Sequence, residues 1–276
     1  MHLLLTHPLP DLAAWMRALQ DADLPVMADT AAALEELRAH EDVADANMLG
    51  ELIATDPLMT LKVMSHVARH RPERRVTDPE TVTAAIVLMG ITPFFRAFQA
   101  LNTAEDWLAS DPEALDGLRA VMARGHRAAR FALAFSVHRM DPETAVIHQA
   151  ALLHDFAEML LWCHAPALAK AIRSAQQAAP GLRSVDAQQA HLNVDLGTLQ
   201  QALMHHWRLP ELLIHMTDDR HADNASVKTV ALAVRLARHS AENWDNPALA
   251  DDMSALAKLL VLSVEATLHL LHEVER

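Results

Sequence analysis

Residues 141–155 read Asp-Pro-Glu-Thr-Ala-Val-Ile-His-Gln-Ala-Ala-Leu-Leu-His-Asp, and this stretch indicates the kind of fold to expect. The leading aspartate can cap free backbone N–H groups, the proline suits a first helical position, and the glutamate favours the positive end of the helix dipole. The apolar run that follows ends in His154 and Asp155, two ionisable residues inside an otherwise apolar helix. The stretch therefore predicts a helix that carries polar side chains in need of partners.

The pattern of a capping residue followed by proline recurs along the chain, and it predicts a helix start at each place after a short turn. It occurs at Asp78-Pro79-Glu80, Asp111-Pro112-Glu113, Asp56-Pro57, Thr92-Pro93 and Asn246-Pro247. Between these marks apolar residues recur at the spacing of a helix face. Examples are Phe131, Phe135 and Val137, and near the C-terminus Val264, Leu268, Leu271 and Val274.

The composition of the chain favours an all-α protein. Of 276 residues, 51% are hydrophobic and 21% charged, which is typical of a globular protein, but only 6 are glycine. Glycine usually makes up about 7% of a protein, and all-β folds and glycine-loop nucleotide folds need it at their turns. The strong helix formers Ala, Leu, Met, Glu, Gln and Arg dominate instead.

The charge balance argues against several classes of partner. The 36 acidic residues outnumber the 23 lysines and arginines, the net charge is −13, and tyrosine is absent. Such a surface repels phosphate backbones and anionic lipids, so we expect neither nucleic acid nor a membrane as a partner. The single cysteine, Cys163, excludes an intrachain disulfide and suits a reducing compartment. We therefore expect a cytoplasmic protein in which Cys163 is a small core residue.

His154 and Asp155 are the side chains best placed for chemistry. Neighbouring residues point about 100° apart on a helix, so a metal ion could lie over the seam between them if another element supplied further ligands. His126, within Arg124-Gly125-His126 at the expected start of the preceding helix, is the third candidate. A second interpretation needs no metal, because the same residues can form a buried polar network that fixes how two helices meet.

Several stretches, taken in order, resemble the HDOD family, the HD-related output domain of bacterial signalling proteins and a branch of the HD phosphohydrolase superfamily. They are Leu24-Pro25-Val26-Met27, residues 52–58 and 61–64, residues 82–90, Ala151 to Asp155, residues 207–213, and Leu259 to Val274 with Ser263 as an N-cap. The resemblance implies a multi-helical, HD-like fold with an N-terminal lobe and an HD-like lobe. It predicts a helical extension over 1–23, the HDOD domain over 24–222, and C-terminal helices over 223–276 that pack on that domain.

The resemblance also implies which residues would hold a metal. His126, His154 and Asp155 match the first three metal ligands of the superfamily. His221 matches one member of a histidine pair that follows later in the family pattern. These four residues are the predicted metal ligands, and the cation would be Mn, Fe, Ni, Zn or Mg.

Other positions depart from the pattern of the relatives that hydrolyse cyclic dinucleotides. Where the resemblance leads one to expect lysine, histidine and glycine, this chain has Glu158, Leu196 and Gln200. Leucine cannot ligate a metal, and a carboxylate in place of lysine is poorly suited to a phosphate ester. Hydrolysis also needs an open metal position, an activated water and a charge clamp.

Two classes of function follow. The incomplete site favours a non-catalytic regulatory output module of bacterial signal transduction, which acts through contacts with other signalling proteins and has no catalytic residues. The alternative is a metal-dependent phosphohydrolase or phosphodiesterase acting on a nucleotide or cyclic dinucleotide. A sensor that binds a nucleotide without cleaving it is a third class.

Overall fold

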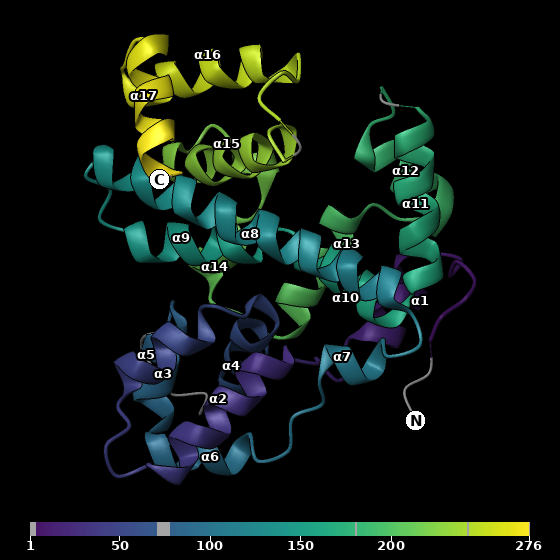
Figure 1. The fold of residues 1–276 in the computed structure, drawn as a ribbon, viewed down its shortest axis with the longest axis vertical. Helices are drawn as coiled ribbons and strands as arrows, with labels where there is room; N and C mark the ends of the chain where they lie inside the picture. The colour runs from purple at the N-terminus through teal and green to yellow at the C-terminus, as the bar shows by residue number, and fades with distance from the viewer. Residues whose placement is uncertain (1–3, 71–77, 180, 242, 276) are drawn as a thin grey trace. The chain divides into compact units, whose positions relative to one another are not determined.

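The computed structural model describes residues 4–70, 78–179, 181–241 and 243–275, and Figure 1 shows this part of the chain as a set of helices. No strand forms within these residues, where Val26 and Thr103 pair only as an isolated bridge. The structure therefore confirms the predicted all-α fold class. The chain divides into two compact units, which are described one at a time.

The first unit comprises Met1–Met122 and Asp155–Pro210. Its helices are α1 (Leu12–Leu19), α2 (Ala28–Ala39), α3 (Ala46–Ile53), α4 (Pro57–His70), α5 (Val82–Met89), α6 (Ile91–Ala97), α7 (Ala104–Trp107), α10 (Phe156–His164), α11 (Pro166–Ala178), α12 (Ser184–Leu192), α13 (Leu196–His206) and the first part of α8 (Pro112–His138). Helix α10 contacts α4, α11 and α13, while α1 packs on α13. A helix that is buried on several sides suits the nearly continuous apolar sequence of α10.

Two tryptophans tie the N-terminal helix into the core of the first unit. The Trp15 side chain is fully buried on α1, and its indole N–H donates to the Leu192 carbonyl at 2.8 Å. The Trp207 indole N–H donates to the Gln20 carbonyl at 2.7 Å, and the Trp207 ring lies 5.7 Å from that of Phe156. Each ring thus combines a large buried apolar area with a satisfied polar atom.

The second unit comprises Ala123–His154 and Glu211–Arg276. It contains the rest of α8, then α9 (Thr144–Leu153), α14 (Glu211–Met216), the 3₁₀ turn η1 (Asp219–His221), α15 (Ala225–His239), α16 (Ala248–Leu260) and α17 (Val264–Val274). Helix α9 packs on α14 and α15, α15 packs on α16, and α16 is followed by α17 at an angle of 96°. The buried apolar residues of α9, among them Ile147 and Leu153, explain why this helix lies inside the unit.

The cap-then-proline pattern predicts some helix starts correctly. Helix α4 begins at Pro57 and α8 at Pro112, directly after their capping aspartates, and the Asn246 side chain accepts from the Ala248 N–H at the start of α16. The predicted N-cap Ser263 is also confirmed, because its hydroxyl accepts from the Ala266 N–H at 3.1 Å.

Three predicted starts are displaced. Helix α5 begins at Val82 rather than at Asp78-Pro79, because the Thr81 hydroxyl provides the cap. Helix α6 begins at Ile91, ahead of Thr92-Pro93, since Gly90 with φ of +85° turns the chain directly out of α5. Helix α9 begins at Thr144, because Asp141 caps a turn by accepting from the Glu143 N–H at 3.0 Å.

The apolar periodicity identifies helices correctly but does not identify every buried residue. Phe131, Phe135 and Leu271 are fully buried, whereas Val137 is 60% exposed. Val264 and Leu268 of α17 are also exposed. Cys163 is buried, as predicted, and no single helix among the described residues is long and apolar enough to cross a membrane.

Candidate functional site

His154 lies where α9 ends. It is the C-cap residue of that helix, and its side chain is 12% exposed. Its Nε2 atom lies 3.1 Å from Oδ1 of Asp219, a residue of η1 whose side chain is 62% exposed. A carboxylate 65 residues away in sequence therefore binds the first imidazole of the predicted site.

Asp155 belongs to the first unit, whereas His154 belongs to the second. Asp155 is the N-cap residue of α10 by backbone conformation, but its side chain does not cap that helix. Its carbonyl oxygen accepts from the Glu158 N–H at 3.0 Å and from the Met159 N–H at 3.3 Å. These backbone bonds begin α10.

His126 is part of the interior of α8 and does not begin a helix, which corrects the expectation from the sequence. Helix α8 continues through this position from its start at Pro112, since no capping residue or proline interrupts it. His126 is close enough to His148 of α9 that its charge contributes to a lower pKa there. Burial is the larger cause of the lowered pKa of His148.

His221 ends η1, and its Nδ1 atom lies 3.1 Å from Oδ2 of Asp218. The ring of His221 also lies 5.0 Å from that of His215 on α14. The sequence patterns do not identify His148 and His215 as neighbours of the predicted site. Each of the two histidines lies six residues before a predicted ligand. Residues six apart do not share a face of a helix, so this spacing does not indicate that the side chains are neighbours.

Asp218 is strongly bound by its own turn. Its side chain is buried and accepts from Nε and Nη2 of Arg220, each at 2.8 Å, and from the Arg220 backbone N–H at 3.1 Å. The hydrogen bonds from Arg220 are the main reason that the pKa of Asp218 lies below its usual range, against the opposing effect of burial. This carboxylate is therefore charged and already neutralised by a guanidinium.

The donor groups meet in pairs. His154 contacts Asp219, and His221 contacts Asp218. Within the described ranges no group of three or more His, Cys, Asp or Glu side chains is arranged to hold a metal ion. The ligand set predicted from the resemblance, His126, His154, Asp155 and His221, stays a prediction.

The three positions that depart from the family pattern have structural surroundings of their own, all in the first unit. Leu196 is buried at the start of α13, and Gln200 is buried one turn later. The Gln200 side-chain oxygen accepts from the Ala157 N–H at 3.3 Å, in the first turn of α10. Glu158 is half-buried in the same turn. Leu196 is thus a buried apolar residue where the resemblance would lead one to expect a histidine, and Gln200, where it would lead one to expect glycine, joins α13 to α10.

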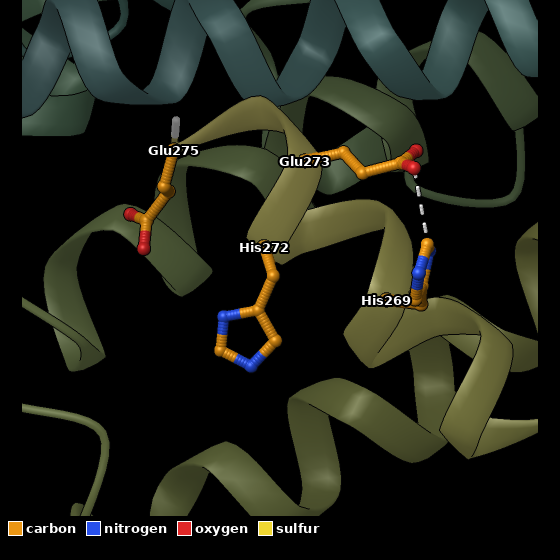
Figure 2. A pocket seen from close by; sticks show the side chains of 4 residues that line it. All are labelled: His269, His272, Glu273 and Glu275. Atoms are coloured by element: carbon orange, nitrogen blue, oxygen red, sulfur yellow. Dashed lines mark ion pairs between the residues drawn. The ribbon is translucent and has the colours of Figure 1, made fainter.

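A hollow of about 450 Å³ on α17 contains none of the predicted site residues. Figure 2 shows its lining residues, His269, His272, Glu273 and Glu275, with the ion pair between His269 and Glu273 at 3.5 Å. Glu275 also accepts from Nε of Arg127 at 2.5 Å. Since Glu273 and Glu275 already contact His269 and Arg127, the hollow is not a set of free ligands.

The family to which these features point is identified by comparison. The HDOD domain family matches residues 24–223, so the chain belongs to the HDOD family. No curated protein sequence matches the chain.

Solved structures share the fold at low sequence identity. The MmoQ response regulator from Methylococcus capsulatus is 20% identical with a TM-score of 0.64, and the alignment covers 92% of this chain and 99% of that one. A virulence factor from Campylobacter jejuni is 18% identical with a TM-score of 0.62, and the coverage is 90% and 87%. At these identities the likeness shows a common fold.

Proposed function

We propose that this protein is a non-catalytic regulatory output module of bacterial signal transduction that acts by binding other signalling proteins. Membership of the HDOD family supports a role in signalling. So does the fold shared with a protein described as a response regulator. The alternative is a metal-dependent phosphohydrolase acting on a nucleotide or cyclic dinucleotide.

The observation that carries the proposal is the use of Leu196 and Gln200 as packing residues. Both side chains are buried, and Gln200 bonds to the backbone of α10. Restoring a histidine at Leu196 would place a polar group in a buried apolar contact, which costs free energy unless a partner is supplied. The positions therefore favour helix packing over ligand binding.

The ion pairs of the second unit point the same way. A metal at His154 would have to compete with Asp219, and one at Asp218 would have to compete with the Arg220 guanidinium. Phosphate-ester hydrolysis further needs an open coordination position and a cationic clamp. The nearby arginine is engaged by a carboxylate, which weakens its use as a clamp.

Metal content combined with turnover tests the proposal. The purified chain is analysed for Mn, Fe, Ni, Zn and Mg, and then assayed with cyclic dinucleotides and nucleotides as substrates. We expect no stoichiometric metal and no product. We also expect the double variant His154→Ala with Asp155→Ala to fold, with His206→Ala on the exposed end of α13 as the control.

The wild-type chain could instead contain stoichiometric metal and hydrolyse a substrate. If the double variant loses both properties and His206→Ala keeps them, the protein is a phosphohydrolase. Thermal shift with the same nucleotides separates the third class of function. Saturable stabilisation without product would indicate a nucleotide sensor, because a ligand that binds only the folded state raises its stability.

A further inference from the structure

The side chain of Arg127 joins three segments of the second unit. It projects from α8, and its Nη1 atom donates at 2.7 Å to the carbonyl of Ser240, the C-cap residue of α15. Its Nε atom donates to the Glu275 carboxylate at 2.5 Å, and its Nη2 atom forms an ion pair with the same carboxylate oxygen. The guanidinium thus holds the ends of α15 and α17 against α8.

Two aromatic rings fix the orientation of this guanidinium. Its central carbon lies 5.3 Å from the centroid of the Phe131 ring and 5.4 Å from that of the Trp244 ring. The Arg127 side chain is 17% exposed and that of Glu275 is 23% exposed, so water screens this pair less than it screens a surface ion pair. A guanidinium held by rings and by a carbonyl is preorganised to bind a carboxylate, so we expect the pair to contribute to stability.

Helix α17 itself buries little of its surface. It packs on α16, and its buried side chains are Thr267 and Leu271. The Thr267 hydroxyl donates to the Ser263 carbonyl, which lies at the start of the same helix. Helix α15, by contrast, is buried along most of its length, from Val227 to Ala237. Because packing supplies most of the stability of a helix in a protein, we expect α17 to be held less firmly than α15.

The two ends of α17 are anchored in different ways. At its start the Leu262 N–H donates to the Ala257 carbonyl of α16, and the Ser263 hydroxyl caps the first turn. At its end Glu275 is the C-cap residue, and a carboxylate is unfavourable at this negative end of the helix dipole. Arg127 supplies the opposite charge at this point. Loss of the pair would therefore release the last turn of α17 while the first turn stayed joined to α16.

We propose that α17 opens from the second unit as one arm, and that the pair of Arg127 and Glu275 is the clasp that keeps this arm closed. The hinge is formed by residues 261–263, which connect α16 to α17 at an angle of 96°. The closed arm shields Leu271 and occupies the carboxylate-binding guanidinium of Arg127. The inference is independent of the proposed signalling function, because it uses none of the predicted metal ligands.

Hydrogen–deuterium exchange of the full purified chain, read by mass spectrometry, tests the arm. An arm that opens by itself exchanges its amides faster than helices that open only with the whole unit. We expect amides 268–274 of α17 to exchange about tenfold faster than amides 230–237 of α15, after correction for intrinsic rates.

The variant Glu275→Gln tests the clasp. The neutral amide loses the charge-assisted bonds from Arg127, so the α17 amides should exchange about fivefold faster, with the α15 amides unchanged. Arg127→Lys should also speed exchange in α17, because an ammonium keeps the charge but lacks the fork that reaches both Glu275 and Ser240. Circular dichroism shows whether the variants fold.

The matched control is Glu273→Gln, which removes the same charge from the same end of α17. The Glu273 side chain is 57% exposed and pairs with His269 rather than with Arg127, and Figure 2 shows that it points to a different side of the helix from Glu275. Removal of a carboxylate from the negative end of the dipole favours the helix, so this variant should leave exchange unchanged or slow it by less than about twofold.

Three results would each overturn the proposal. Amides of α17 that exchange as slowly as those of α15 would show that the arm does not open by itself. Equal effects of Glu275→Gln and Glu273→Gln would show that the pair with Arg127 is not a clasp. Equal acceleration of α15 and α17 by Glu275→Gln would show that the whole unit opens together.

Discussion

The buried carboxylate of Asp56 offers the sharpest test of how the first unit is held together. The Asp56 side chain is fully buried at the start of α4. Its Oδ1 atom accepts from the N–H groups of Leu58 at 2.9 Å and Met59 at 3.1 Å, and Oδ2 accepts from the Met27 N–H at 2.7 Å. One side chain therefore caps a helix and also fixes a loop that lies 29 residues earlier.

The structure gives a graded expectation for two substitutions. Asp56→Ala leaves three backbone N–H groups without their acceptor, and each buried unsatisfied group costs about 1–3 kcal/mol. Because the chain can relax, we expect a total loss of about 3–5 kcal/mol of unfolding free energy, which is large for one substitution. Asp56→Asn keeps the acceptor for Leu58 and Met59 but turns an amide donor toward the Met27 N–H, so the loss should be about 1–2 kcal/mol.

Urea unfolding followed by circular dichroism measures both losses, with the slope of the transition as a check on two-state behaviour. The control is Asp45→Ala, because Asp45 caps α3 by accepting from Asn47 and Met48 but is exposed to solvent. That change should cost about 1 kcal/mol. If Asp56→Ala costs no more than Asp45→Ala, the burial of the carboxylate and its long-range bond contribute nothing, and the reasoning is wrong.

Three further predictions concern other buried groups. Gly117→Ala should lower the unfolding free energy measured in urea by about 1–2 kcal/mol, because the new Cβ would lie 2.6 Å from the buried Trp162 ring and this overpacking exceeds the gain in helix propensity. Burial, with the charges of its neighbours, lowers the pKa of His66, so the unfolded chain binds the proton more readily. The contribution of neutral His66 to folding stability is thus present above the ordinary histidine pKa and is lost as pH falls below that pKa. In thermal unfolding, His66→Gln should lose less stability on acidification than the surface control His206→Gln. Burial also raises the pKa of the Cys163 thiol, so iodoacetamide should label it, by mass spectrometry, in urea but not in the folded chain.

The local part of the fold is predictable from sequence because its causes are local. Asp56-Pro57 and Asp111-Pro112 predict helix starts correctly, since a cap and a proline act on the first turn that follows them. The bond from the Met27 N–H to Asp56 has no such signal, because a contact over 29 residues depends on where the chain returns. The sequence predicts the cap but not the second role of the carboxylate.

The candidate site shows the same limit. His154 is found at the end of the expected helix, yet its partner Asp219 lies 65 residues further on and could only be located in the folded chain. His148 and His215 were missed because their spacing to the predicted ligands matches no helix face. Apolar periodicity has a related weakness. It groups Val137 with Phe131 and Phe135, but only the folded chain shows that the two phenylalanines are buried and Val137 is exposed.

The ion pairs around η1 lead to one physical argument about how two neighbouring carboxylates are accommodated in the second unit. A carboxylate left as an unpaired charge is costly when it is buried. The buried Asp218 avoids that cost because the Arg220 guanidinium neutralises it, whereas the exposed Asp219 contacts His154. The pair between Asp218 and Arg220 thus stabilises the turn that precedes α15. On this argument Arg220→Ala should destabilise the chain more than Lys228→Ala on α15, measured by urea unfolding. A metal ion added to Arg220→Ala should recover stability if Asp218 retains any affinity for cations.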